Sequence, residues 1–403
     1  MKRTVLLVPG FVADTYCEIE RSYVELSAAA AGSDLRFVWL VPEIDWKYNS
    51  FKNPANRGAM DKPACVPHLE RHGVPVVFGN LSKYNPIRNY LVFRRVFRQF
   101  DVDAVYTHFG FERFWATFFA KLWGKTTIWN EHWNSLNTRY VLAKRVFYRL
   151  FVDEFIAVSR FIQGTLPKGK PAHAIPNAVA DVARNPCSEE IASLRRRLGI
   201  DDRAQVVLMV AGFRPEKRHG LALDVCERVR ARLPSTVFVF VGDGVTRGQF
   251  LREVRARGLE RCVVAPGHVE NVDDYYAMAD VCMLTSYNDG FGYCVIEAMR
   301  AGRPMIAFAN GGPGEIIRPE ETGVLIRDGD VAAFAERLVG LLEDPVLRRR
   351  LGDAAREVVR REYSRETWAR RLNGVLESIV DRHRKQGSGG GQSKRAVGSS
   401  PGR

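Results

Sequence analysis

The chain has 403 residues, of which 46% are hydrophobic, and it carries a formal net charge of +14 at pH 7. Its length exceeds one ordinary hydrophobic core and predicts two domains, and its composition is ordinary for a soluble globular protein. No apolar run approaches the roughly 18 residues of a membrane span, and the short apolar run after the basic start is interpreted as a first strand rather than a signal peptide. Seven scattered cysteines without metal-ligand spacing argue against disulfides and zinc and favour a cytoplasmic protein.

The positive charge is unevenly distributed. Residues 1–180 carry 24 Lys and Arg against 15 Asp and Glu, and the last 23 residues carry six basic residues against one acidic residue. Such an excess would attract an anionic membrane surface or nucleic acid. Because no RNA-binding signature is present, we expect no specific nucleic-acid partner, and peripheral contact with an anionic membrane stays open.

Strand and helix signals alternate along the first 180 residues. We expect strands at 4–8, 35–41, 74–79, 102–108, 126–130 and 154–158, helices at 17–30, 87–100, 111–123 and 141–151, and a long loop at 43–72. Strands that alternate with helices predict a parallel sheet covered on both faces. A linker near 179–190 leads to residues 191–365, where the same alternation predicts a second domain of this class.

The expected helix at 87–100 has apolar residues at helical spacing and four arginines, at positions 88, 94, 95 and 98. This pattern fits a helix that lies on a membrane surface. It also fits a helix that packs on the core and exposes a basic face, which is the interpretation we favour.

The end of the chain divides into two parts. Residues 366–385 carry a further helix signal. Residues 386–403 lack apolar side chains that could be buried, so we expect a disordered basic tail.

Two histidines stand where strands of the first domain are expected to end, His108 after VDAVYT and His132 after TIWNE. Ligands of parallel α/β sheets bind at the carboxyl ends of strands, so both residues are candidates for a binding crevice. A single histidine at such a position is more often structural, and this interpretation is stronger for His108.

The stretch from Thr285 to Ile317 organises the second domain. An apolar strand ends there in a turn with Gly290 and Gly292, and a helix begins near Tyr293. Glycines let the backbone approach a ligand, and the free amides of a helix N-terminus favour an anion. Asp289 before the turn and Glu297 about one turn into the helix would repel a phosphate but can accept hydrogen bonds from hydroxyls on either side of it.

A second basic turn follows the strand expected at 205–211, in the segment GFRPEKRHG. Arg214 offers a bidentate fork and Lys217 a mobile point charge, both suited to a diphosphate. A solvated charged loop would show the same residues.

The segment NDGFGYCVIEAMRAGRPMIA closely resembles the acidic E-x7-E motif of retaining glycosyltransferases of family 4, with Asp289 where Glu is usual. The resemblance covers nearly the whole chain and is strongest over 203–345. It implies the GT-B fold, in which two Rossmann-like α/β domains face each other across a cleft. Residues 1–180 would bind the acceptor, 191–365 the nucleotide-sugar, and 366–385 would pack back on the first domain.

The resemblance also implies roles for individual residues. Glu297 would hold the ribose, and the backbone of Val269 would read the base. The candidate catalytic residues are His132, Lys217, Arg214 and Asp289, and the candidate donor-binding residues are Glu297, Gly290, Phe291, Gly292, Tyr293, Val269, Gly10 and His108. The usual Gly-Gly loop after the first strand is reduced here to Gly10, and Arg214 is displaced from the family's position.

The expected reaction is retaining transfer of a sugar from a nucleoside diphosphate to an acceptor hydroxyl, with UDP favoured over GDP on base rate. A bacterial polysaccharide or glycolipid acceptor is expected. No cofactor or metal is expected, and the Asp-x-Asp pairs at 101–103 and 328–330 are interpreted as charges near turns and helix ends.

Three alternatives stay open. A nucleotide-sugar epimerase shares the GT-B fold, and a non-catalytic nucleotide-sugar-binding module would retain the site. An NAD-dependent enzyme would need a G-x-G-x-x-G turn after the first strand, and the segment PGFVAD does not provide it.

Overall fold

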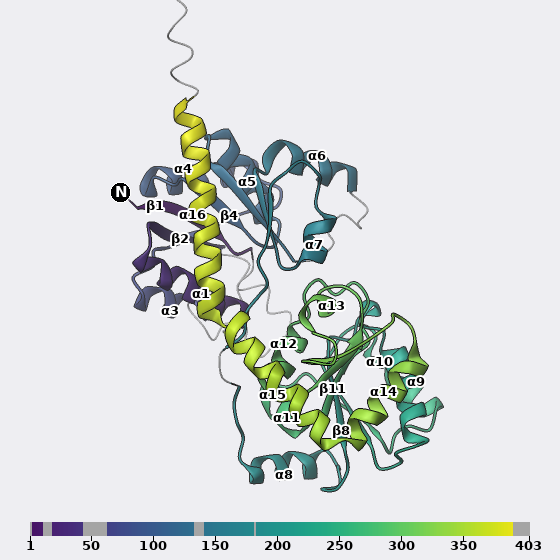
Figure 1. Cartoon of the computed structure of the whole chain (residues 1–403). Helices are drawn as coiled ribbons and strands as arrows, with labels where there is room; N and C mark the ends of the chain where they lie inside the picture. The colour runs from purple at the N-terminus through teal and green to yellow at the C-terminus, as the bar shows by residue number, and fades with distance from the viewer. Residues whose placement is uncertain (1, 11–17, 43–62, 133–140, 181–182, 390–403) are drawn as a thin grey trace, which may run out of the picture.

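The computed structural model describes residues 2–10, 18–42, 63–132, 141–180 and 183–389. Two parallel sheets lie in separate halves of the molecule, each covered by helices (Figure 1). The first has seven strands in the order β3-β2-β1-β4-β5-β6-β7, and the second has six in the order β10-β9-β8-β11-β12-β13. The predicted architecture of two doubly wound α/β units is therefore confirmed.

The first half contains seven strands and six α-helices within the described residues. They are β1 (Arg3–Val8), α1 (Glu18–Ala29), β2 (Leu35–Pro42), α3 (Val66–Arg71), β3 (Val76–Gly79), α4 (Pro86–Phe100), β4 (Ala104–Thr107), α5 (Glu112–Leu122), β5 (Thr126–Glu131), α6 (Val141–Phe151), β6 (Glu154–Ala157), α7 (Arg160–Thr165) and β7 (Ala172–Ala174).

The second half continues the alternation. Its elements are α8 (Ser188–Arg197), β8 (Val206–Val210), α9 (His219–Arg230), β9 (Val237–Val241), α10 (Arg247–Ala256), β10 (Val263–Gly267), α11 (Val272–Met278), β11 (Val281–Leu284), α12 (Tyr293–Arg300), β12 (Met305–Phe308), α13 (Pro313–Ile316), β13 (Gly323–Ile326), α14 (Val331–Glu343) and α15 (Pro345–Glu362), followed by α16 (Arg365–Gly389).

Two expectations about loops were wrong in part. The predicted loop at 43–72 contains α3, which has Pro67 in its first turn and buries Val66 and Leu69; its part at 43–62 lies outside the described residues. The helix is too short to show a periodic apolar pattern. The segment predicted as a linker at 179–190 likewise already contains the start of α8, where the Glu190 carboxylate accepts from the Cys187 backbone N–H at 2.8 Å.

The central strand β1 shows how each sheet is buried on both faces. Val5 and Leu7 belong to the core beneath α1, α3 and α16, whereas Leu6 and Val8 belong to the core beneath α4 and α5. Successive side chains of a strand point to opposite faces, so a strand covered on both sides reads as one continuous apolar run.

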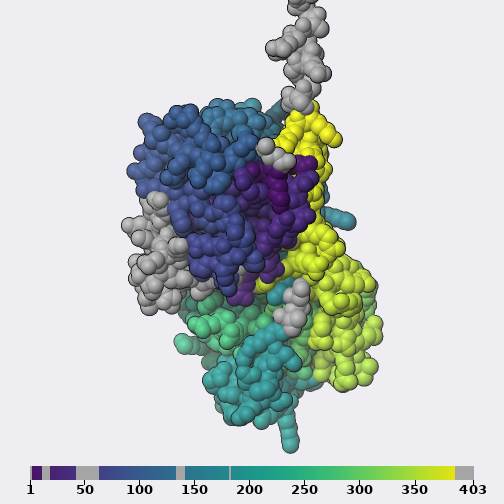
Figure 2. All heavy atoms as spheres, turned by 90° about the vertical axis from the view of Figure 1, so that its left-hand side faces the viewer, coloured from purple at the N-terminus to yellow at the C-terminus, as the bar shows by residue number. Residues whose placement is uncertain are grey.

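The last helix links the two halves. α16 follows α15 of the second half and runs along α1 of the first, with its yellow atoms beside the purple N-terminal residues in Figure 2. Trp368, Leu372, Leu376 and Ile379 recur at helical spacing and are all buried in this contact. The packing agrees with what the family resemblance implies for this segment.

α16 continues to Gly389, so the expected disorder from residue 386 was wrong for its first turn. Sequence reasoning ended the helix where apolar residues stop, but backbone hydrogen bonds carry a formed helix beyond its last packed side chain. Residues 390–403 of the predicted tail lie outside the described residues.

α4 packs on the core, as we favoured. Phe93, Val96 and Phe97 are buried, while Arg95 points outward and donates to the carbonyl of Phe78 at 2.8 Å. No helix in the described part of the chain is long and apolar enough to cross a membrane.

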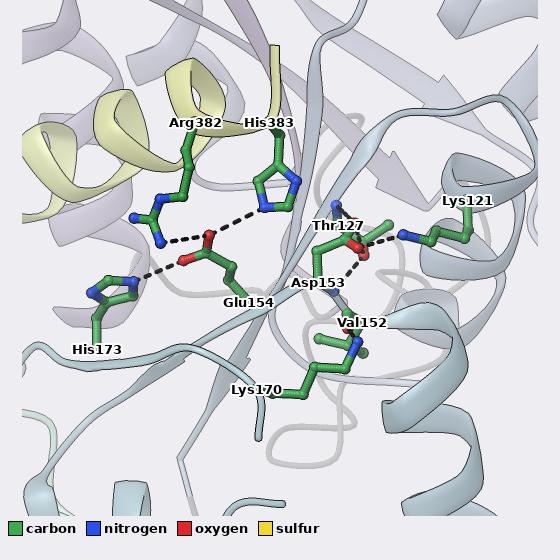
Figure 3. A network of polar contacts seen from close by, with 9 residues as sticks. All are labelled: Lys121, Thr127, Val152, Asp153, Glu154, Lys170, His173, Arg382 and His383. Carbon is green, nitrogen blue, oxygen red and sulfur yellow. Dashed lines mark hydrogen bonds and ion pairs between the residues drawn. The ribbon is translucent and has the colours of Figure 1, made fainter. Parts of the chain in front are cut away.

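A buried carboxylate fastens α16 to the first sheet (Figure 3). The side chain of Glu154 is 1% exposed; it bonds to His173 Nε2 at 2.9 Å and His383 Nε2 at 3.1 Å, and pairs with Arg382 at 3.3 Å. Burial by itself would raise the pKa of Glu154, but the hydrogen bond from His173 and the charge of Arg382 outweigh it and hold the pKa below its usual value.

We predict that Glu154→Gln destabilises the protein. Removing the charge leaves the guanidinium of Arg382 without this counter-ion, and the expected loss is about 2 kcal/mol, or a melting temperature lower by about 4 to 8 °C. The depressed carboxyl pKa means that the stabilisation is present above the ordinary carboxyl pKa and is lost as the pH falls through the folded value, so the difference from wild type should shrink between pH 5 and pH 3. The measurement is thermal unfolding monitored by circular dichroism across this range.

The control is Glu377→Gln on the same helix. The carboxylate of Glu377 accepts only an exposed hydrogen bond from the Asp34 backbone, at 3.2 Å. Loss of the Glu377 charge should change the melting temperature by no more than about 1 °C. Equal shifts in both variants would contradict a special role for Glu154.

Candidate functional site

A cleft of about 1010 Å³ lies between the two halves. In each sheet the strand order reverses at one point, between β1 and β4 and between β8 and β11. Ligands of open α/β sheets bind outside the carboxyl ends of strands at such points. The cleft is lined by His132, Phe109 and Asn177 from the first half and by Lys217, Asp289 and Glu297, among others, from the second.

The glycine turn before α12 is shaped by close packing. Gly292 has φ of +93°, a left-handed conformation that favours glycine, and it caps α12. A side chain at Gly290 would place its Cβ 2.1 Å from the carbonyl oxygen of His132. Gly292, Tyr293 and Cys294 line the cleft, and the first amides of a helix lack partners within the helix. The turn can therefore present N–H groups to an anion.

Lys217 and Asp289 meet in the cleft as an ion pair. Their side chains are only 12% and 13% exposed, so the pair is little screened by water. The hydroxyl of Thr285, at the end of β11, donates to the carbonyl of Lys217 at 3.0 Å, and the Tyr287 N–H donates to that of Glu216 at 2.7 Å. These bonds fix the turn that carries Lys217 against the segment between β11 and Asp289.

Glu297 is oriented by a buried tyrosine that the sequence reasoning did not single out. The hydroxyl of Tyr276 on α11 donates to Glu297 Oε2 at 2.9 Å. Burial, and next the charge of Glu297, raises the pKa of Tyr276 well above its usual value, so the phenol stays protonated as a donor. Glu297 itself lines the cleft.

His132 is stacked on Phe109, with ring centroids 4.4 Å apart, and its Nε2 lies 3.0 Å from His108 Nδ1. Burial, with a smaller contribution from the charge of Arg113, lowers the pKa of His132 to about 3. Burial likewise lowers the pKa of His108. His132 is therefore neutral at physiological pH and offers the cleft an uncharged imidazole.

The structure brings most of the predicted site residues together. His132, Arg214, Lys217, Val269, Asp289, Phe291, Gly292, Tyr293 and Glu297 all line the cleft. Arg214 also pairs with Glu216 at 3.1 Å and stays more than half exposed.

Three predicted donor-binding residues do not line the cleft. His108 lies behind His132, and Gly290 packs against the backbone of His132. Gly10 instead allows close packing of two backbone segments, since a Cβ there would lie 1.6 Å from the carbonyl oxygen of Phe109.

Asn177 and Phe109 line the cleft but were not predicted. Asn177 is 4% exposed, and its Nδ2 has no hydrogen-bond partner within the described ranges. Phe109 follows the strand predicted at 102–108, which was the available signal, whereas Asn177 follows β7, a strand that the sequence did not predict. Their side chains could not be assigned to the cleft without knowing how the two halves face each other.

The two Asp-x-Asp pairs have structural partners. Asp103 accepts from the Thr4 N–H at 2.8 Å and from Arg384, Asp328 pairs with Arg218 at 3.0 Å, and Asp330 caps α14. Among the residues that the structure describes, no group of three or more His, Cys, Asp or Glu could hold a metal ion.

Comparison with known families agrees with this geometry. The profile of the group 1 glycosyl transferases matches residues 190–358, and that of glycosyltransferase family 4 matches residues 19–181. The chain therefore belongs to glycosyltransferase family 4 and has the GT-B fold.

Its curated relatives match over part of their length. The chain is 29% identical over 177 residues to the N-acetyl-alpha-D-glucosaminyl L-malate synthase of Bacillus anthracis, covering 44% of this chain and 46% of that protein. It is 33% identical over 194 residues to the D-inositol 3-phosphate glycosyltransferase of Salinispora arenicola, covering 45% and 42%. The match thus spans about half the length of these relatives.

Solved structures share the fold over nearly the whole chain. HepE of Anabaena in complex with UDP aligns with a TM-score of 0.71 at 17% identity, covering 93% of this chain and all of that one. Sucrose-phosphate synthase of Thermosynechococcus elongatus aligns with a TM-score of 0.72 at 18% identity, covering 94% and 100%.

We predict that His132→Gln reduces the sensitivity of the protein to acid. A histidine whose folded pKa is near 3 takes up a proton only on unfolding, so acid favours the unfolded chain by about 1.4 kcal/mol for each pH unit below about 6.5. Between pH 7.5 and pH 5.5 the melting temperature of the variant should fall by about 2 to 4 °C less than that of wild type. His72→Gln, at an exposed site after α3, is the control for the loss of a histidine elsewhere in the same half. The same slope in wild type and His132→Gln would contradict the assignment.

Proposed function

We propose that the protein transfers a sugar from a nucleoside-diphosphate sugar to an acceptor hydroxyl with retention of anomeric configuration. The observation that carries the proposal is the arrangement of Lys217, Asp289 and Glu297 around the amides at the start of α12. A cation and backbone N–H groups suit a diphosphate, while a carboxylate on each side suits hydroxyls of sugar and ribose. HepE of Anabaena, which shares the fold, has been crystallised with UDP and with UDP-glucose.

The departing diphosphate would be stabilised by fixed charge. As the bond between the anomeric carbon and the phosphate oxygen breaks, negative charge grows on the leaving group. Lys217, with Arg214 at the rim, would balance this negative charge without a metal. Lys217 would then pair with the phosphate in place of Asp289. Asp289 would then be available to accept hydrogen bonds from hydroxyls of the transferred sugar.

Retention would follow from attack on the face that the diphosphate leaves. The acceptor oxygen bonds to the anomeric carbon, and its proton passes to the departing phosphate oxygen. His132 is neutral, so it would hold a donor-sugar hydroxyl by a hydrogen bond rather than act as a cation. We propose UDP as the nucleotide in preference to GDP, with Val269 at the base, and a polysaccharide or glycolipid acceptor.

Nucleotide binding to site variants tests this function. In isothermal titration with UDP, GDP and ADP, we expect wild type to bind one of them without added magnesium. Lys217→Ala and Glu297→Ala should each weaken that binding by about 10- to 100-fold, because each removes a charged partner of the ligand in a little-exposed site. Lys168→Ala, in the exposed loop after α7, is the control for a lost lysine.

The outcomes separate the candidate functions. Product formed only with donor and acceptor together supports transfer, whereas conversion of the donor alone would support an epimerase. Nucleotide binding without either product would support a binding module. Unchanged affinity in both site variants would contradict the assignment of the cleft.

We also propose that one face of the first half touches an anionic membrane. Of the eleven large hydrophobic side chains that are exposed within the described residues, eight lie between Tyr84 and Leu150. They sit on and beside α4, α5 and α6, which share one face of the sheet (Figure 1). These helices carry exposed arginines and only one acid, the fully buried Glu112. Apolar side chains mixed with cations match the interface of anionic lipid.

Vesicle co-sedimentation tests the contact. Wild type should sediment with anionic vesicles and not with neutral ones. The double variant Leu142→Glu and Val146→Glu on α6 should lose at least about tenfold in binding, since it removes apolar contact and adds repulsion. Val346→Glu, equally exposed on α15, should bind as wild type does, and equal losses in both would contradict a specific face.

A further inference from the structure

A second line of contact joins the two halves behind the cleft. Ser159 caps α7 by accepting from the Ile162 N–H at 3.1 Å, and its hydroxyl donates to the carbonyl of Gly290 at 2.6 Å. Ser159 is 3% exposed. The first half therefore bonds directly to the glycine turn that faces the proposed diphosphate site.

Glu315 makes the matching contact from the second half. Its carboxylate, on α13, accepts from the backbone N–H of Arg160 at 2.9 Å and from that of Phe161. These bonds engage both carboxylate oxygens with the start of α7. Glu315 borders a separate hollow of about 480 Å³ and does not line the main cleft.

The two contacts are mechanically connected through the glycine turn. The Gly312 N–H, directly before α13, donates to the carbonyl of Asp289 at 2.8 Å. A Cβ at Gly312 would lie 2.3 Å from the carbonyl oxygen of Phe291, so the two segments are in direct contact. A movement of α7 relative to α13 would thus be felt at Asp289 and Gly290.

We propose that Glu315 and Ser159 form an interdomain latch that holds the donor turn against His132. Both are positioning residues, which act through Asp289, Gly290 and His132. Their proposed role rests on the function proposed above. In the latched arrangement Gly290 lies against the backbone of His132. Asp289 and His132 would then contact the same donor sugar. When the halves separate, the hydrogen bond of Ser159 and the two hydrogen bonds of Glu315 must break together.

The exposure of Glu315 makes the latch reversible. Its carboxylate lies at the surface, so water can replace both backbone donors when the halves part, and the cost of opening is small. Enzymes of this kind need repeated opening to admit substrates and release products. The latch shifts the population toward the closed form without locking it.

Scattering and kinetics on matched variants test the latch. Glu315→Ala should increase the radius of gyration of the ligand-free protein in small-angle X-ray scattering and lower kcat on the order of tenfold, in proportion to the lost closed population. The dissociation constant for the free nucleoside diphosphate, which uses residues of the second half, should stay within about twofold. Glu315→Gln keeps a carbonyl acceptor of the same size and should restore most of both properties.

Glu321→Ala is the matched control. Glu321 lies close by in the same half and pairs only with Arg318, at 3.2 Å on the surface, so this variant should scatter and react as wild type does. An unchanged radius of gyration and kcat in Glu315→Ala would overturn the latch, and so would a loss that Glu315→Gln shares in full. If no variant, wild type included, transfers sugar, the proposed function fails and the scattering comparison alone decides the latch.

Discussion

Parallel strands deliver their carboxyl ends to one edge of a sheet, and the site of this protein depends on two such edges meeting. Each sheet reverses its strand order once, which leaves a gap between diverging connections at β1/β4 and at β8/β11. His132 follows β5 beside the first gap, and Asp289 follows β11 at the second. Residues more than 150 positions apart in sequence are thereby brought to one cleft without any direct sequence signal that they meet.

Much of this arrangement could be predicted from the sequence because the informative segments are local. The end of a buried strand, a glycine turn and a helix follow one another within residues 281–300, so the sequence alone places Asp289, Gly292 and Glu297 at one site. Lys217 was found in the same way, from a charged turn after a strand. These residues all line the cleft.

What could not be predicted depends on contacts between distant segments. Tyr276 donates to Glu297 from another helix. Neither the spacing of Tyr276 from Glu297 in the sequence nor the composition of its segment predicts this contact. Gly10 was assigned to the ligand by analogy, whereas its backbone is pressed against Phe109. The sequence favours a structural role for His108, but it gives no signal for the contact of His108 with His132. Short elements such as α3 and α7 also escape periodic patterns, because one or two turns carry too few apolar positions.

The same geometry gives a physical reason for aspartate at position 289, where the family motif usually has the longer glutamate. The carboxylate of Asp289 is paired with Lys217 while both are nearly buried, and a buried ion pair is costly to break unless a new partner replaces the old one. In the proposed reaction a diphosphate would offer Lys217 that partner and sugar hydroxyls would offer Asp289 theirs, so neither charge would be left without a partner. A nucleotide without a sugar would satisfy only the lysine and would leave the carboxylate to water. Under the proposed function, the pair would favour a complete nucleotide-sugar over the free nucleotide, which would help the protein to release its product and bind the next donor.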